Sequence, residues 1–374
     1  MLALIRTLLI PIFSLIFAAL GSGLFTTFVS VRLEMDGNSL ILIGAIVSVS
    51  YAGVFAGALV APGWVRRFGY TRATILIYAL NAAAIFCHIF WSNPYYWMAL
   101  RFAVGLAIGA FFTVIESWFL KSSSKAMRGQ ALSIYLILYY AALSTGQLLL
   151  NVSNPRTSGS FLLAGALSML AIVPLFFGAS EPPPKPIALA QQKVFQFSPL
   201  GVLGGIASGM VMASIYGLVP VYGKEINLTI EEISQFMAVI IFGGFSLQWP
   251  LGKWADIQGR RVVLLIVCLV TALLGICIAI LDGLSFFWLL PLCWLFGGTA
   301  FALYPLSMAY VCDGVEEEHL PAAAGRFISS YGIGAVAGPL IASYSISLIG
   351  MSGLFYFMAL VCVLLGLVPA LRKS

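Results

Sequence analysis

Charged side chains are scarce in this sequence. Asp, Glu, Lys and Arg together make up 9% of its 374 residues, whereas they make up about 25% of a typical soluble domain. Hydrophobic residues make up 61%, and the mean hydropathy is +1.04. So few charges leave too little polar surface to cover a water-soluble core. The composition excludes an ordinary soluble protein, and we expect lipid to surround most of the chain.

Metal ligands and nucleophiles are also few. The two histidines, His88 and His319, lie far apart, and the six cysteines fall in apolar runs without paired or metal-ligand spacing. The sequence has no Gly-x-x-x-x-Gly-Lys-Ser/Thr loop that could bind the phosphates of ATP. We therefore expect no metal, no cofactor and no enzymatic activity. The net charge of +6 lies in short loops and reports membrane topology, so we expect no nucleic-acid partner.

The sequence contains many long runs of apolar residues. Because a helix needs about 20 apolar residues to cross the hydrocarbon core, the runs predict an all-α integral membrane protein with twelve transmembrane helices. They lack the alternating period of a membrane β-barrel. No small-residue cleavage site follows the first run, so we expect it to be a span and not a signal peptide. The predicted spans are 8–31, 39–62, 73–92, 95–120, 129–151, 158–179, 198–222, 231–251, 262–281, 285–311, 322–346 and 349–370.

Lys and Arg are distributed unequally between the two sides of these spans. With the N-terminus placed inside, fifteen of the 19 lie on the inner side, three on the outer side, and Arg101 within a span. Cytoplasmic loops carry such an excess of positive charge. We therefore expect a bacterial inner-membrane protein with both termini in the cytoplasm.

The chain also divides into two similar halves. A proline-rich segment at 181–197 follows the sixth span, and its prolines stiffen it and lack the N–H groups that a helix needs. It separates a predicted six-helix bundle at 1–180 from a second at 198–374. Matching polar loops follow the second and eighth spans, so that Gly69 and Gly259 align 190 positions apart. The halves thus read as pseudo-repeats, which are common in transporters.

The loop at 252–261 contains the most specific motif. It reads Gly-x-x-x-Asp-x-x-Gly-Arg-Arg and resembles the loop signature of the major facilitator superfamily. The first-half loop at 62–72 is a degraded copy, with Arg66 in the position of Asp256. The resemblance covers nearly the whole chain and implies the fold of that superfamily, with two six-helix bundles.

Further segments strengthen the resemblance, and several are most similar to the YcaD-like subgroup. Arg101 followed by Gly105 and Gly109 resembles the superfamily's helix-4 arginine motif. Gly334, Gly338 and Pro339 resemble a glycine-proline motif of antiporters, here on the eleventh span instead of the fifth. The small residues also have the spacing that lets helices pack closely. The segments similar to the subgroup are 101–117, 139–147, 214–220, 248–250 and 303–305.

Two ionisable residues, Arg101 and Glu116, lie clearly within the spans, where a charge is costly and needs a reason. Fifteen residues separate them on one helix, which is about 22 Å of rise. Arg101 could bind an anionic or polar substrate or tune the pKa of a proton carrier. It could instead clamp the carbonyls of neighbouring helices or extend to the outer lipid headgroups. Glu116 could carry a proton, or pair with Arg66, Arg67 or Arg128 as a latch on the cytoplasmic gate.

Two further sets of candidates come from the loops and spans. The resemblance implies a cytoplasmic gate latch at Arg66, Arg67, Gly69, Gly252, Asp256, Gly259, Arg260 and Arg261. Hydroxyl, amide and aromatic side chains that could line a cavity, or only bond between helices, are Thr26, Tyr51, Tyr139, Tyr140, Gln147, Tyr216, Gln248, Tyr304, Ser307 and Tyr331.

The sequence therefore predicts a monomeric secondary transporter that moves a small molecule by alternating access. Sparse polar groups among aromatic ones favour small amphiphiles, exported at the expense of a proton gradient. Two alternatives stay open. One is uptake of a sugar or another polar nutrient. The other is a membrane sensor or scaffold of the same fold, because one fold hosts many functions.

Overall fold

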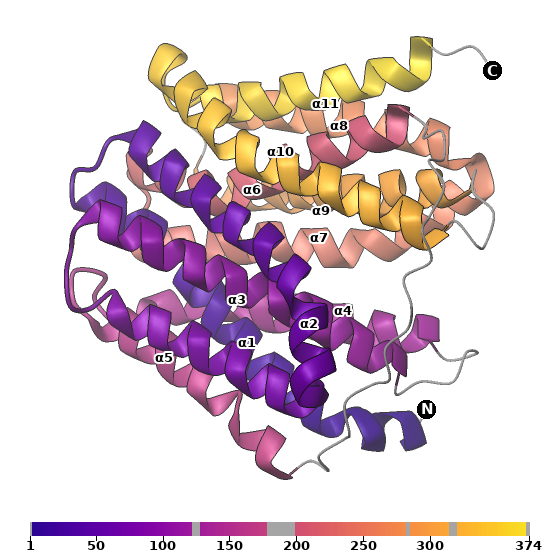
Figure 1. Cartoon of the computed structure of the whole chain (residues 1–374). Coiled ribbons are helices and arrows are strands. Elements are labelled where there is room, and N and C mark those ends of the chain that lie inside the picture. Colours follow the sequence, from indigo (N-terminus) through magenta and orange to yellow (C-terminus); the bar gives the residue numbers. More distant parts are fainter. Residues whose placement is uncertain (1, 122–127, 178–198, 282–284, 314–319, 372–374) are drawn as a thin grey trace. The chain divides into compact units, whose positions relative to one another are not determined.

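The protein is described by a computed structural model that covers residues 2–121, 128–177, 199–281, 285–313 and 320–371 (Figure 1). Within these ranges every regular element is a helix. The α-helices are α1 (Leu2–Met35), α2 (Leu40–Cys87), α3 (Pro94–Lys121), α4 (Arg128–Leu148), α5 (Gly159–Leu170), α6 (Pro199–Glu225), α7 (Ile230–Gln258), α8 (Arg260–Ile280), α9 (Phe286–Asp313), α10 (Leu320–Ile349) and α11 (Gly353–Leu371). Short 3₁₀ turns, Leu149–Val152 and Val173–Phe177, extend α4 and α5.

Helix α2 contains two of the predicted spans. It has non-helical angles at Gly69 (φ 78°, ψ 172°), so the described residues form twelve helical segments. The prediction of a loop over 62–72 was wrong, because only Gly69 breaks the helix there. In the same way α7 and α8 are separated by Gly259 alone (φ 89°). Apolar runs reveal only the part of a helix in lipid, whereas these helices continue into their polar ends.

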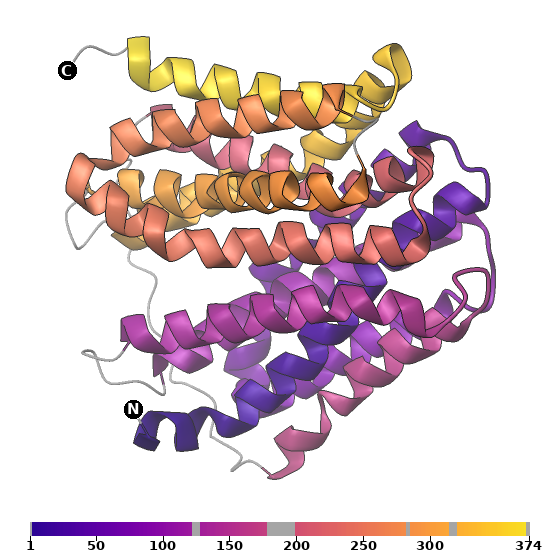
Figure 2. The same cartoon turned by 180° about the vertical axis from the view of Figure 1, so that it is seen from behind.

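The chain divides into two compact units. Unit 1 contains residues 1–32 and 49–188, and unit 2 contains residues 33–48 and 189–374. The boundary after residue 188 falls in the predicted linker at 181–197, which lies outside the described residues. The start of α2 belongs to unit 2, where a Cβ on Gly44 would meet Pro339 O of α10 at 2.7 Å. Within unit 2, α10 packs on α6, α7 on α9, and α11 on α8 (Figure 2).

The turns after α1 and α6 show the internal repeat in atomic detail. Gly37 N–H donates to Glu34 O at 2.8 Å, and Asn227 N–H donates to Lys224 O at 3.1 Å. Both residues have a positive φ, 77° and 64°. Gly37 and Asn227 are 190 positions apart, which is the spacing of Gly69 and Gly259. The two halves therefore share turn geometry although their side chains differ.

Small residues bring the helices of each unit into backbone contact. A Cβ built on Gly105 of α3 would meet the carbonyl oxygen of Ser50 in α2, and one on Gly297 of α9 would meet that of Ile240 in α7. The same holds for Gly109 against Val54, and for Gly334 against Ile206. Glycine is required at these crossings because a side chain would displace the neighbouring helix. A Cβ on Gly338 would likewise meet the backbone of Met210 in α6.

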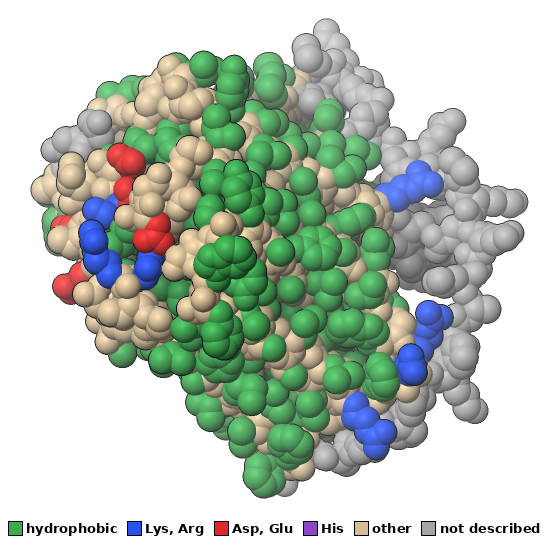
Figure 3. Space-filling model, turned by 60° about the vertical axis from the view of Figure 1, so that its left-hand side comes forward, with side chains coloured by type: hydrophobic (Ala, Val, Ile, Leu, Met, Phe, Trp, Pro, Cys, Tyr) green, Lys and Arg blue, Asp and Glu red, His purple; other side chains and the backbone are tan. Residues whose placement is uncertain are grey.

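Large apolar side chains cover the outer faces of the helices. Phe90 is 80% exposed and Trp249 is 74% exposed. The face drawn in Figure 3 is covered mainly by hydrophobic side chains, while its charged side chains gather near the edges. Among the described residues, ten helices are long and apolar enough to cross a membrane, and one of them is α2 with its two segments. Lipid is the solvent that such a surface requires.

Candidate functional site

Arg101 lies near the start of α3 in unit 1 and is almost fully buried. Its exposed fraction is 5%, and its Nε and Nη1 atoms donate no hydrogen bond in the part of the chain that is described. The guanidinium carbon lies 5.2 Å from the centre of the Phe25 ring. Tyr51 and His88 are within electrostatic range. No Asp or Glu forms an ion pair with Arg101 within the described ranges, so this cation lacks a protein counter-ion there.

Glu116 lies five residues before the end of the same helix, which is apolar enough to span a membrane, and its side chain reaches the surface of the protein. The hydroxyl of Tyr135 in α4 donates to its Oε1 at 3.4 Å. Among the described ion pairs, none joins Glu116 to Arg66 or Arg67. The side chain of Arg128, the third predicted latch partner, lies outside the described residues. Glu116 is thus an accessible carboxyl at an apolar helix, hydrogen-bonded to a tyrosine.

The signature loop of unit 2 forms an ionic cluster around Arg260. Its Nη1 donates to Asp313 Oδ1 at 2.6 Å and to Ala309 O at 2.7 Å, both at the end of α9. Its Nη2 lies 3.4 Å from Asp256 Oδ1, one turn earlier at the end of α7. Arg260 therefore ties the α7–α8 junction to α9. Arg261 also has an interaction, whereas Gly252 meets open space.

The corresponding junction of unit 1 is built differently. Arg66 and Arg67 are exposed, and Arg67 lies over the ring of Phe68 at 5.3 Å. Tyr70, which follows Gly69 as Arg260 follows Gly259, stacks on Trp118 of α3 with ring centres 5.9 Å apart. In unit 1 an aromatic contact joins α2 to α3, whereas in unit 2 an ion pair joins the corresponding helices α8 and α9.

The two units contain aromatic pairs at equivalent positions, 192 residues apart in the sequence. In unit 1, Phe112 of α3 meets Tyr139 of α4 edge-on at 5.0 Å. In unit 2, Tyr304 of α9 meets Tyr331 of α10 edge-on at 5.1 Å. Each pair contains a predicted cavity residue. Phe112, Tyr304 and Tyr331 are half-buried, whereas Tyr139 is buried. Tyr140 is in edge-on contact with Tyr139 at 5.4 Å.

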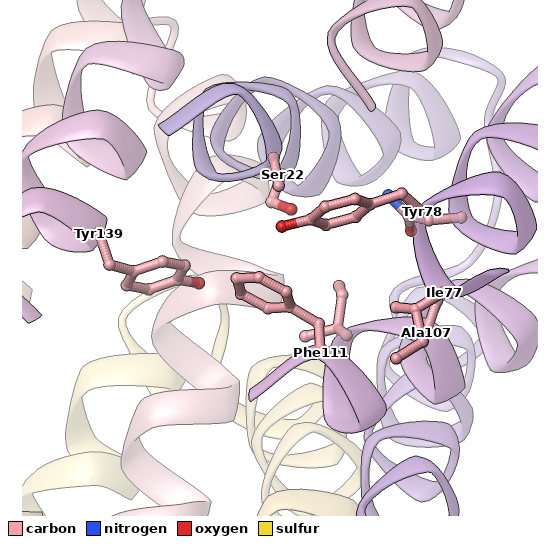
Figure 4. Close-up of a pocket in the computed structure, with 9 residues that line it drawn as sticks. Ser22, Ile77, Tyr78, Ala107, Phe111 and Tyr139 are labelled. Carbon is pink, nitrogen blue, oxygen red and sulfur yellow. The ribbon is translucent and has the colours of Figure 1, made fainter. Parts of the chain in front are cut away.

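Unit 1 contains a small pocket lined by residues of α1, α2, α3 and α4 (Figure 4). Its volume is about 10 Å³, which is close to the room that one water needs. Tyr78 and Asn81 line it, and the Tyr78 hydroxyl and Asn81 Oδ1 are buried without a hydrogen bond inside the described ranges. In Figure 4 the hydroxyls of Ser22 and Tyr78 point toward one another. Tyr139, a predicted cavity residue, lines this space as well.

The other predicted cavity residues fall into two groups. Gln147 and Ser307 are fully buried in helix contacts. Thr27 donates to Gln147 Oε1, and a Cβ on Gly204 would meet Ser307 Oγ at 2.6 Å. These two residues bond or pack between helices. The half-buried group consists of Thr26, Tyr51, Tyr140, Tyr216, Gln248, Tyr304 and Tyr331.

Sequence reasoning missed Asp313 and Tyr135 as partners of the charged residues. Asp313 ends a long apolar run, and that position could have suggested a helix-terminal ion pair. Tyr135 lies among many aromatic residues, and nothing in its neighbourhood marks it. From the sequence, His88 is not expected to bind a metal. The structure places it beside Phe25 and Phe161, with Nδ1 2.8 Å from Ala84 O. No cluster that could hold a metal occurs among the described His, Cys, Asp and Glu residues.

The fold and these sites define a polytopic membrane transporter built from two repeats. The sequence matches the Major Facilitator Superfamily over residues 3–318 and again over 201–373. The chain belongs to the major facilitator superfamily, and the predicted family is confirmed.

Proteins with similar sequences are described as MFS-type transporters. The chain is 29% identical to an uncharacterized MFS-type transporter of Yersinia pestis over 346 residues, covering 90% of this chain and 88% of the relative. It is also 29% identical to the uncharacterized MFS-type transporter YcaD of Escherichia coli over 343 residues, covering 89% and 87%.

Solved structures share the fold at low sequence identity. A mutant of the nucleoside transporter NupG superposes with a TM-score of 0.80 at 14% identity, covering 97% of this chain and 98% of that one. A D-xylose-proton symporter superposes with a TM-score of 0.74 at 13% identity, covering 99% and 97%. At such identities the likeness shows the fold alone.

Proposed function

We propose that this protein is a proton-coupled secondary transporter that exports small amphiphilic compounds from the cytoplasm by alternating access. Glu116 is the proton carrier in this proposal. The observation that carries it is an accessible carboxyl on a membrane-spanning helix, hydrogen-bonded to Tyr135 and not paired with Arg66 or Arg67. Intramembrane acids of this kind are typical of proton relays.

A proton carrier must bind and release its proton at each cycle. A carboxyl in a strong ion pair with arginine would stay ionised, because the neighbouring cation favours the charged form. A tyrosine hydroxyl can donate to the ionised carboxyl without adding a charge. The contact with Tyr135 therefore supports a carboxyl that can exchange protons, and it leaves the latch on the cytoplasmic gate to Arg260 and Asp256 in the other unit.

The choice of an amphiphile rests on the accessible side chains of unit 1. Tyr51, Phe112 and Tyr140 are half-buried and present three aromatic rings with two hydroxyls among them. Sites for small molecules are mostly apolar, with a small number of polar groups that fix orientation. A sugar would require more hydrogen-bonding side chains than these residues supply.

The test is a flux measurement in proteoliposomes that contain a pH-sensitive dye. Amphiphilic aromatic compounds and sugars are added in turn to the wild type, Glu116→Gln and Tyr135→Phe. We expect substrate-dependent proton flux in the wild type, no flux in Glu116→Gln, and reduced but measurable flux in Tyr135→Phe, which keeps the carboxyl.

Other outcomes select the alternatives. Proton flux that persists in Glu116→Gln contradicts its role as carrier. Flux with sugars alone would favour a nutrient porter, and substrate movement without protons would contradict coupling. Vesicles of known protein orientation, loaded on one side, decide between export and uptake. No movement of any compound across the panel would favour the sensor or scaffold.

A further inference from the structure

We propose that Arg101 is a carboxylate-binding group, so that the transported amphiphile carries a carboxylate that pairs with this guanidinium. The inference rests on the proposed function for its claim of transport, and it adds the charge and chemical class of the substrate. Arg101 is buried, no described acid pairs with it, and its neighbours are aromatic.

Arg101 has hydrogen-bond donors that no described acceptor satisfies. Arg101 is 5% exposed, and its Nε and Nη1 donate to no acceptor of the described chain. Buried polar groups in folded proteins nearly always have a partner, and a guanidinium stays charged in proteins. The buried guanidinium of Arg101 therefore has unsatisfied donors that can bind an acceptor from outside the described chain.

No described carboxylate balances the charge of Arg101. The described groups near Arg101 are the ring of Phe25 at 5.2 Å, the phenol of Tyr51 and the imidazole of His88. None of them is a carboxylate. The acid on the same helix, Glu116, is fifteen residues away, which corresponds to about 22 Å of helix rise. The negative charge that balances Arg101 is thus expected to come from outside the described chain.

The guanidinium of Arg101 and its aromatic neighbours favour an amphiphilic carboxylate as the ligand. A planar guanidinium pairs with carboxylate or phosphate through parallel hydrogen bonds. One arginine balances one negative charge, which suits a carboxylate better than a doubly charged phosphate. The aromatic neighbours Phe25 and Tyr51 suit an apolar body attached to that carboxylate. An amphiphilic monocarboxylate satisfies both requirements, whereas chloride would satisfy only the charge.

The test measures binding without any proton gradient. Purified protein in nanodiscs is titrated with 2-naphthoate, with the neutral isostere 2-naphthamide, and with chloride alone, and the shift of thermal unfolding gives the apparent Kd. The variants are Arg101→Gln and Arg101→Lys. Arg156→Gln is the matched control, because Arg156 is exposed and belongs to the same unit.

We expect the wild type and Arg156→Gln to bind 2-naphthoate about tenfold or more tightly than 2-naphthamide, as a charge-assisted pair implies. Arg101→Gln is expected to bind the two probes equally. Arg101→Lys keeps the charge without the planar donors and is expected to retain part of the preference, which also controls for misfolding of the glutamine variant.

Three results would overturn the inference. The first is a wild type that binds the amide as well as the carboxylate, or binds neither. The second is a carboxylate preference that survives in Arg101→Gln. The third is stabilisation by chloride alone that equals the effect of 2-naphthoate and disappears in Arg101→Gln. The titration requires neither flux nor a proton gradient, so failure of proton coupling and failure of this inference are distinguishable.

Discussion

Gly105 lies so close to α2 that a Cβ added to it would meet the carbonyl oxygen of Ser50. The contact joins backbone to backbone, so no side-chain rotation can relieve it. Gly297 has the same relationship to Ile240 in unit 2. The pair of crossings shows that the internal repeat conserves helix proximity.

Replacing Gly105 by alanine is expected to destabilise the protein by about 1–3 kcal/mol, the usual cost of overpacking. Thermal unfolding in detergent measures the change. Gly63→Ala is the control, because nothing lies within 4 Å of a Cβ at Gly63. Equal stability of the two variants would contradict the proposed contact.

The two glycines of the signature loop are expected to respond differently. Gly259 has φ 89° and ψ 132°, which side chains rarely adopt, whereas Gly252 has ordinary helical surroundings and open space. Gly259→Ala is expected to cost about 1–3 kcal/mol of stability. Gly252→Ala is expected to be neutral or slightly stabilising. Chemical denaturation of both variants tests the contrast, and a tolerated Gly259→Ala would show that the α7–α8 junction does not need this backbone conformation.

Asp313 is expected to matter more than Asp256 for holding Arg260, because their oxygens lie 2.6 Å and 3.4 Å from the guanidinium. Both carboxylates are more than half exposed, so Asp313→Asn is expected to cost no more than about 1 kcal/mol. Asp256→Asn is expected to cost less.

Salt provides the control for this cluster. The difference between wild type and Asp313→Asn is expected to shrink near 1 M salt, where the screening length is about 3 Å. Thermal unfolding at low and high salt measures it. A difference that does not depend on salt would assign the loss to packing.

Thr229 begins α7 with a reciprocal cap. Its hydroxyl accepts from Glu232 N at 3.2 Å, and Glu232 Oε2 accepts from Thr229 N at 2.8 Å. Thr229→Ala is expected to destabilise the protein by about 1 kcal/mol. Glu231→Gln, in the same turn, leaves both hydrogen bonds in place and is expected to have a smaller effect. Denaturant unfolding of the two variants compares them, and the reverse order would rule out the cap as the cause.

Much of the fold follows from local composition. Each span of about 20 apolar residues must be helical in lipid, because an unpaired backbone amide is costly there. The twelve spans, the two repeats and the family could therefore be predicted. Gly69 and Gly259 could be located from the repeat, although the loops expected around them proved to be single-residue breaks.

The partners of the charged residues depend on tertiary structure. Arg260 meets Asp313, which is 53 positions away in the chain, and Glu116 meets Tyr135 on the next helix. Helix rotation and crossing decide such pairs, and many rotations suit an apolar sequence equally well because lipid and protein interiors are similarly apolar. The sequence by itself determined the apolar helices, the similarity of the two halves and the family. Only the tertiary structure decided that Arg101 is buried with no described acid paired to it and that Glu116 contacts a tyrosine.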